Sequence, residues 1–259
     1  IIFPVFSGHW EILQFLLFFW QFPLSDTISE SKESSEVMDV FDIIGPVMIG
    51  PSSSHTAGAC RLGRVANKLM DGRTPSRCDI ILSGSFSRTG RGHGTDRAIV
   101  GGIMGFETDD TRIRDALDIA KEEGIEINFI HQDIPNAHPN TARITYYLPD
   151  GRSGFMQGAS VGGGNIRIDI INGMEVKFSG DKETILVLHR DVPGVIANVT
   201  NLMHLMYSDI NIGAFQLSRR EKGGEALMTI EADSVPPEKI TADIRQTPDV
   251  LNCLLIHKI

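Results

Sequence analysis

A polar loop near the start of the chain carries the residue types best suited to chemistry. It reads Gly50-Pro51-Ser52-Ser53-Ser54-His55-Thr56 and comes just before an expected helix. The free backbone N–H groups and the dipole at a helix start favour an anion such as a carboxylate. His55 is the one side chain of the loop that can move a proton near neutral pH. The loop therefore predicts a site for an acid and a proton transfer; the alternative interpretation is a helix cap with a surface histidine.

A second polar segment is rich in glycine and reads Gly90-Arg91-Gly92-His93-Gly94-Thr95-Asp96. Its three glycines allow the backbone to approach a ligand or another chain closely, and His93 and Asp96 add proton chemistry or an anchoring charge. It lacks the Gly-Lys-Ser/Thr ending of a phosphate-binding P-loop. A purely structural turn is the alternative.

Two further motifs follow along the chain. In His138-Pro139-Asn140-Thr141 the proline fixes the backbone, so that His138 and Asn140 can point toward a cleft; a strand-entry turn is the alternative. Gly162-Gly163-Gly164-Asn165 predicts a tight turn or a close backbone approach. The nucleophile elbow of serine hydrolases and the His-Glu-x-x-His metal motif are both absent from the sequence.

Alternating helices and strands position these motifs. Apolar residues at three- and four-residue steps predict a helix over residues 59–70. The apolar segment 39–48 and the polar loop precede this helix. A buried strand at 79–83 leads into an expected glycine-rich loop at 84–94. Further helices are expected at 95–104 and 111–123, and strands at 125–131, 142–148, 153–157, 165–171 and 174–179.

The last part of the chain, from Thr184 to Ile259, has a βαββαβ pattern. Strands are expected at 185–189, 211–219, 225–232 and 250–257, and helices over 196–203 and 237–245. This order packs two helices on one face of a four-stranded antiparallel sheet. The polar segment 179–183 predicts a domain boundary.

Composition narrows the function. A chain of 259 residues favours two modest domains, and a net charge of −9 argues against a nucleic-acid partner. The three cysteines, Cys60, Cys78 and Cys253, are too few and too scattered for a disulfide framework, which indicates a reducing, cytoplasmic location. They also do not match the clustered thiolates of an iron–sulfur site, so any such cluster needs ligands from another chain.

Residues 1–37 differ from the rest of the chain. This segment is apolar and aromatic up to Leu24. It has no Lys or Arg before Lys32, so it does not match a secretory signal. Polar residues interrupt its apolar stretch, so it does not match a membrane span either. We expect it to be upstream sequence translated by error or disordered, with Met38 as the natural start. A real apolar extension is the alternative.

Together the four motifs resemble a known family. The run from Val40 to Gly58 closely resembles the start of the beta chains of iron–sulfur L-serine dehydratases, and the other three motifs follow in the family's order. The resemblance covers residues 38–259. It implies an α/β (α+β) fold: residues 38–180 are similar to the allosteric-substrate-binding domain of some phosphoglycerate dehydrogenases, and residues 184–259 to a ferredoxin-like ACT domain.

The resemblance also implies a reaction and partners. L-Serine is converted to pyruvate and ammonia without pyridoxal phosphate, and an open iron of a [4Fe-4S] cluster on a separate alpha subunit binds the substrate hydroxyl. L-Serine is also a possible effector, and the ACT domain is expected to dimerise; no membrane is involved. Two alternatives are a regulatory subunit that binds an amino acid and has no catalytic residues, and an independent hydrolase or phosphate-binding enzyme.

Site residues follow from the same resemblance, and none is expected to bind metal. The expected catalytic residues are His55, Ser53 and Ser54. The expected substrate-binding residues are Ser52, Thr56, His93, Asp96, His138 and Asn140. The expected effector-binding residues of the ACT domain are Asp191, Pro193 and Gly194.

Overall fold

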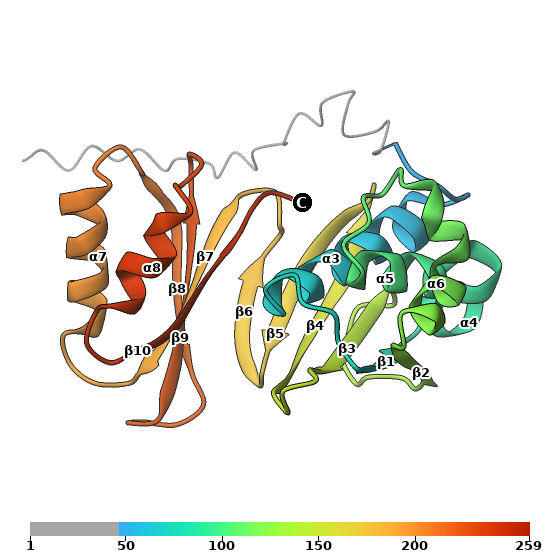
Figure 1. The fold of residues 1–259 in the computed structure, drawn as a ribbon, viewed down its shortest axis with the longest axis horizontal. Coiled ribbons are helices and arrows are strands. Elements are labelled where there is room, and N and C mark those ends of the chain that lie inside the picture. Colours follow the sequence, from blue (N-terminus) through green and yellow to red (C-terminus); the bar gives the residue numbers. More distant parts are fainter. Residues whose placement is uncertain (1–46) are drawn as a thin grey trace, which may run out of the picture. The chain divides into compact units, whose positions relative to one another are not determined.

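The computed structural model describes residues 47–259, which fold into two sheets with their helices (Figure 1). The expectations for residues 1–37, and for the apolar segment before Val47, lie outside the described residues. Within 47–259 no helix is both long and apolar enough to cross a membrane. The mixed α/β class expected from the sequence is confirmed.

The first sheet has six strands in the order β2-β1-β3-β4-β5-β6. Only β1 and β2 run parallel, because a helical crossover joins them, while the later strands are joined by turns and run antiparallel. The strands are β1 (Arg77–Leu82), β2 (Glu126–His131), β3 (Thr141–Tyr147), β4 (Ser153–Gly162), β5 (Asn165–Ile171) and β6 (Met174–Phe178). The helical segments are η1 (Ser53–Gly58), α3 (Ala59–Leu69), α4 (Ser85–His93), α5 (Thr95–Ile103), η2 (Thr111–Asp115) and α6 (Ala116–Glu122).

The second sheet has the predicted βαββαβ order. Its strands are arranged β10-β7-β9-β8, all antiparallel, with their own core around Val199, Met228 and Ile240. Its elements are β7 (Glu183–Arg190), α7 (Val195–Met206), β8 (Ile212–Arg219), β9 (Glu225–Ala232), α8 (Lys239–Arg245) and β10 (Val250–Ile256). The described residues cluster as one compact unit, and the expected domain boundary near residue 180 stays a prediction.

Helices α3 and α5 cross in close contact. Two glycines meet at the crossing: a Cβ on Gly63 would lie 2.8 Å from the Ile103 nitrogen, and one on Gly102 would lie 2.8 Å from the Arg64 nitrogen. Backbone therefore packs directly on backbone, a distance that only glycine permits. The crossing sets where η1, just before α3, lies relative to the start of α5.

The segment expected to be a glycine-rich loop, 84–94, is instead helix α4. The loop interpretation was wrong because it took every glycine of this segment as a sign of a turn. Only the two flanking glycines need a backbone that other residues avoid: Gly84 has φ 59° and Gly94 has φ 72°. Between them the fully buried Phe86 holds the helix against the core.

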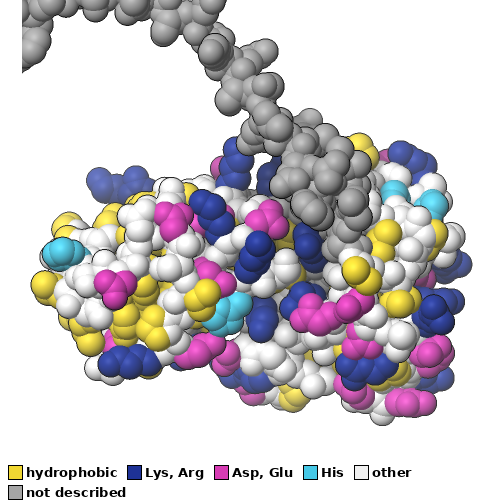
Figure 2. All heavy atoms as spheres, turned by 90° about the horizontal axis from the view of Figure 1, so that it is seen from above, with side chains coloured by type: hydrophobic (Ala, Val, Ile, Leu, Met, Phe, Trp, Pro, Cys, Tyr) yellow, Lys and Arg dark blue, Asp and Glu magenta, His cyan; other side chains and the backbone are white. Residues whose placement is uncertain are grey.

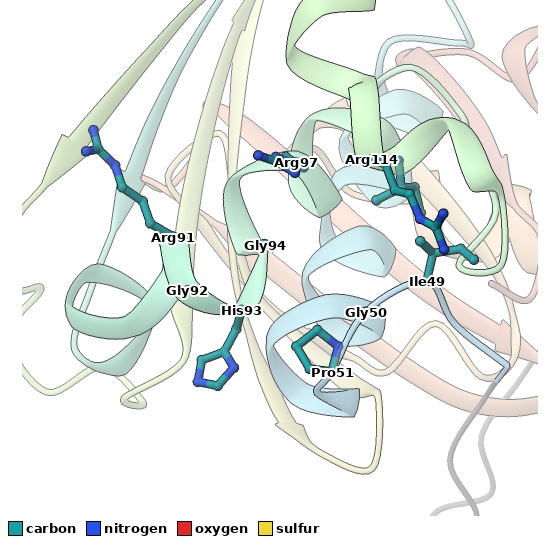
Figure 3. Close-up of a pocket in the computed structure, with 10 residues that line it drawn as sticks. Ile49, Gly50, Pro51, Arg91, Gly92, His93, Gly94, Arg97 and Arg114 are labelled. Atoms are coloured by element: carbon teal, nitrogen blue, oxygen red, sulfur yellow. The ribbon is translucent and has the colours of Figure 1, made fainter.

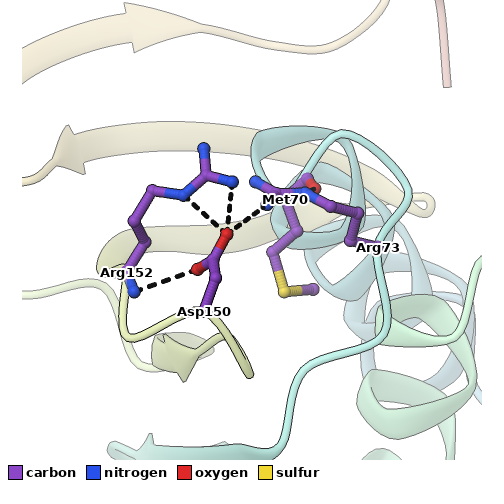
Figure 4. A network of polar contacts seen from close by, with 4 residues as sticks. All are labelled: Met70, Arg73, Asp150 and Arg152. Carbon is purple, nitrogen blue, oxygen red and sulfur yellow. Dashed lines mark hydrogen bonds and ion pairs between the residues drawn. The ribbon is translucent and has the colours of Figure 1, made fainter.

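A salt-bridge network joins the end of α3 to the β3–β4 turn (Figure 4). The Arg73 guanidinium donates to the Met70 carbonyl oxygen at 3.0 Å and pairs with the Asp150 carboxylate at 3.0 Å. Arg152 Nε also donates to Asp150 at 2.8 Å. These bonds, led by those from Arg152, lower the pKa of Asp150 to about 2.

The Asp150→Asn variant is therefore expected to unfold more readily than the wild type at neutral pH. A carboxylate with a lowered folded-state pKa stabilises the fold above its unfolded pKa, near 4, and loses that contribution as the pH falls through about 2. Urea unfolding should show a constant difference between the two proteins above about pH 5, shrinking from about pH 4 toward pH 2. A difference that grows on acidification would contradict this assignment.

Candidate functional site

The polar loop forms the first turn of a helix that continues into α3. η1 is a π-helix, a rare form that is frequent at functional sites. Ser52 caps it: the Ser52 hydroxyl accepts a hydrogen bond from the His55 backbone N–H at 3.2 Å. Ser53 and Ser54 lie half-buried in the first turn. The loop is thus a helix cap, as the simpler interpretation held, and it also aims His55 at α4.

Two hydroxyl groups of α4 hold the His55 ring. Nε2 of His55 lies 3.1 Å from Ser85 Oγ and 3.0 Å from Thr89 Oγ1. The His55 ring also packs edge-on against Phe86, with 5.3 Å between ring centroids. Sequence reasoning missed Ser85 and Thr89 because it expected a loop there; their four-residue spacing on one helix face was the available signal.

His93 lies on another side of the His55 ring, with 4.9 Å between the ring centroids. Burial lowers the pKa of His55, the nearby His93 lowers it further, and the contact with Ser85 opposes them. Both lowering effects disfavour the imidazolium form. His55 is therefore a neutral imidazole at physiological pH, the form able to accept a proton.

Reciprocal hydrogen bonds lock η1 to the junction of α4 and α5. The Thr95 hydroxyl donates to the His55 carbonyl oxygen at 3.0 Å, and the Thr56 hydroxyl donates to the His93 carbonyl oxygen at 3.1 Å. Both threonines are buried. The hydroxyl of Thr56, which was expected to bind substrate, thus joins the first two motifs through this hydrogen bond.

The third motif lies against the start of α4. The Ser85 backbone N–H donates to the Pro139 carbonyl oxygen at 2.6 Å, and a Cβ on Gly84 would come 2.8 Å from Pro139 Cα. His138 Nδ1 accepts from the Asn140 N–H at 3.2 Å. In the neutral ring the proton of His138 is therefore on Nε2. His138 and Asn140 are both half-buried beside the residue that contacts His55.

The fourth motif turns beside η1 and α3. Gly162, Gly163 and Gly164 have φ values of 115°, 59° and 88°, which confirms the predicted tight turn. Arg61 Nη1 donates to the Gly164 carbonyl oxygen at 3.1 Å. Just before the turn, Ser160 is fully buried, and a Cβ on Gly58 would overlap its side chain. All four motifs therefore meet around η1 and the start of α4.

Asp96 is not brought to His55. Its carboxylate accepts from the Arg97 N–H at 2.9 Å in the first turn of α5, and Asp96 lines a different cavity, of about 130 Å³, with Phe129 and His131. The expected substrate-binding role of Asp96 finds no support in this placement and stays a prediction.

The expected effector residues lie at the start of α7. The Asp191 carboxylate accepts from the Gly223 N–H at 2.9 Å and from Arg219 Nη1 at 2.8 Å. These two bonds lower the pKa of Asp191. Pro193 and Gly194 are exposed, and Gly194 has φ 95°. Asp191 thus holds the β8–β9 hairpin through Oδ2, and the exposed backbone of Pro193 and Gly194 lies beside it.

His93 also lines a cavity of about 230 Å³ (Figure 3). The backbone of Ile49 to Pro51 and of Gly92 to Gly94 forms its walls, and basic side chains from α4, α5 and η2 complete it. The cavity therefore borders both the polar loop that begins at Gly50 and the glycine-rich segment that begins at Gly90.

The cysteines do not fit an iron–sulfur cluster. Cys60 is on α3, Cys78 on β1 and Cys253 on β10, and all three are buried. Burial raises the pKa of each thiol to about 12, whereas a cluster binds thiolates. In the part of the chain that the structure describes, no group of three or more His, Cys, Asp or Glu side chains is placed to hold a metal ion.

Comparison with known proteins identifies the family. A model of the serine dehydratase beta chain matches residues 36–124. The chain is 48% identical over 212 residues to a probable L-serine dehydratase beta chain of Bacillus subtilis, covering 82% of this chain and 94% of that one. It is 38% identical over 205 residues to the L-serine dehydratase beta chain of Peptoniphilus asaccharolyticus, covering 79% and 91%.

A shorter match is to D-3-phosphoglycerate dehydrogenase of Bacillus subtilis, 32% identical over 139 residues, covering 53% of this chain and 26% of that one. This likeness agrees with the α+β fold described above. Because two beta chains match over more than nine tenths of their own length, and because the four motifs meet at one place, the resemblance to L-serine dehydratase beta chains is confirmed. The chain belongs to the family of L-serine dehydratase beta chains.

Proposed function

We propose that this chain deaminates L-serine to pyruvate and ammonia together with an alpha subunit. The observation that supports this most is His55: a neutral imidazole held by two hydroxyls where all four family motifs meet. The alpha subunit carries the [4Fe-4S] cluster in this proposal, and pyridoxal phosphate takes no part. The unsuitable environment of the three cysteines supports placing the cluster on another chain.

Different residues of this chain have different roles in the proposed reaction. The hydroxyls of Ser52, Ser53 and Ser54 and the free N–H groups of the first turn of η1 hold the serine carboxylate. His55 accepts the Cα proton. The electron pair of that C–H bond forms the Cα=Cβ bond as the C–O bond breaks, and the hydroxide leaves as water after gaining a proton. The resulting 2-aminoacrylate reacts with water to give pyruvate and ammonia.

Half-buried His138 and Asn140 line the substrate side of α4 in this proposal. His138 presents its Nε2 proton, because Nδ1 already accepts from the Asn140 backbone. The second sheet supplies oligomerisation in this proposal: Phe215 and Leu217 of β8 are apolar side chains, about 40% exposed, that a second copy would cover. We place the assembly in the cytoplasm, with L-serine as both substrate and possible effector at the start of α7.

The test is reconstitution. This chain and the alpha chain, purified separately without oxygen, are assayed for pyruvate and ammonia from L-serine, alone and mixed. We expect equal amounts of both products from the mixture only. A mixture that forms a complex and binds L-serine without turning it over would favour a regulatory role instead.

The pH dependence gives a second test through His93→Asn. The acid limb of kcat/KM reports the pKa of the essential base, and with His55 it should lie below pH 6.5. His93 lowers the pKa of His55, so its replacement should move the limb to higher pH. Asn keeps the backbone carbonyl that accepts from Thr56. An unchanged or downward-shifted limb would exclude His55 as the titrating base.

A further inference from the structure

Three arginines border the cavity beside His93. Arg91, Arg97 and Arg114 line it, all are exposed, and none forms an ion pair with the residues that the structure describes. Nine of the other arginines of residues 47–259 form such pairs, and four, Arg88, Arg143, Arg220 and Arg245, do not. What distinguishes Arg91, Arg97 and Arg114 is that all three border one cavity, on a chain of net charge −9.

Arg97 and Arg114 are the central pair of this group. They come from α5 and η2, and in Figure 3 Arg114 extends toward Ile49, Arg97 lies beyond Gly94, and Arg91 points away. On the face of the molecule that Figure 2 shows, acidic and basic side chains lie side by side.

The lining of the cavity resembles the centre of a protein interface. It combines backbone and apolar groups, from Gly50, Pro51, Gly94 and Ile113, with basic side chains. Interfaces are enriched in arginine at such positions, because a guanidinium can bind a carboxylate through two parallel hydrogen bonds. A volume of about 230 Å³ admits one or two side chains.

We propose that this cavity receives an acidic side chain of the alpha subunit, whose carboxylate pairs with Arg97 and Arg114. The inference rests on the proposed function and names the surface through which that partner docks. His93 lines the cavity and also packs against His55, so the contact fixes the alpha subunit near the proton-transfer site. A second copy of this chain is the competing occupant, since the chain has a net charge of −9.

The test compares two charge-reversed double variants. Arg97→Glu with Arg114→Glu changes the charge by four units at the cavity. Lys177→Glu with Lys222→Glu makes the same change at exposed residues on β6 and in the β8–β9 hairpin. Circular dichroism and melting curves first establish that both fold. The affinity of each for the alpha subunit is then measured at several salt concentrations.

The arginine variant is expected to bind the alpha subunit about 10²-fold more weakly, and the lysine control within about threefold of the wild type. The salt dependence of binding should also weaken in the arginine variant. Arg97→Gln with Arg114→Gln should fall between the two. Replacing the partnering alpha-chain carboxylate with Lys should restore binding of the reversed variant.

Two results overturn the proposal. One is equal binding by the arginine variant and the lysine control. The other is self-association of this chain alone, measured by sedimentation, that the arginine variant abolishes without any change in alpha-subunit binding. Either result is compatible with the proposed dehydratase function. A wild-type chain that fails to bind the alpha subunit would instead contradict the proposed function itself.

Discussion

Replacing His55 by Ala in the complex with the alpha subunit is expected to lower kcat for L-serine by at least about 10²-fold. His55 is the ring on which the motifs converge: Ser85 and Thr89 fix Nε2, and burial with His93 lowers the pKa of the ring. Loss of a positioned base removes the proton transfer, while the binding groups on η1 remain.

The control for this variant is His204→Ala. His204 is exposed on α7, so its removal should leave turnover unchanged. Both variants are first shown to bind the alpha subunit with wild-type affinity, which separates catalysis from assembly. Near-normal turnover by the His55 variant would remove the imidazole from the mechanism.

Replacing Gly102 by Ala is expected to lower the free energy of unfolding by about 3 kcal/mol or more. The added Cβ would overlap the Cys60 carbonyl oxygen and lie 2.9 Å from Gly63 Cα. All of these atoms belong to the α3 backbone, which no side-chain rotation can move aside. Relief requires α3 and α5 to separate, and this also breaks the bond from Thr95 to the His55 carbonyl.

Gly92→Ala is the matched control. Gly92 lies in α4 with no atom within 4 Å of its added Cβ, and it needs no left-handed backbone. Alanine there should raise stability by about 0.5 kcal/mol, since glycine in a helix costs conformational entropy. Urea unfolding of the two variants measures both effects. A Gly102 variant as stable as the Gly92 variant would show that the helix crossing tolerates a side chain.

Much of the fold followed from the sequence. The period-two strands of the first sheet and the βαββαβ order of the second were predictable, because each alternation of apolar residues has one buried face. β4 was predicted to end at Gln157 but continues to Gly162. Its extension contains Gly158, where an added Cβ would contact Leu62 of α3, and such close packing leaves no trace in local pattern.

The candidate site was half predictable. The position of His55 before a helix could be predicted, and the turn at Gly162 to Gly164 follows from glycine itself, whereas Ser52 was identified as the helix cap only by the structure. The partners of His55 could not be predicted. The glycines Gly90, Gly92 and Gly94 indicated a loop, whereas the structure has helix α4, which holds Ser85 and Thr89 on one face. Asp96 follows His93 by three residues, yet it lines a different cavity, with Phe129 and His131, and its substrate-binding role stays a prediction.

The most direct measurement is of iron, acid-labile sulfide and serine turnover in this chain and in the alpha chain, each purified without oxygen. We predict a cluster on the alpha chain alone, no cluster on this chain, and pyruvate only after mixing. A stoichiometric cluster on this chain by itself, or pyruvate formed by it unaided, would contradict the division of labour proposed here.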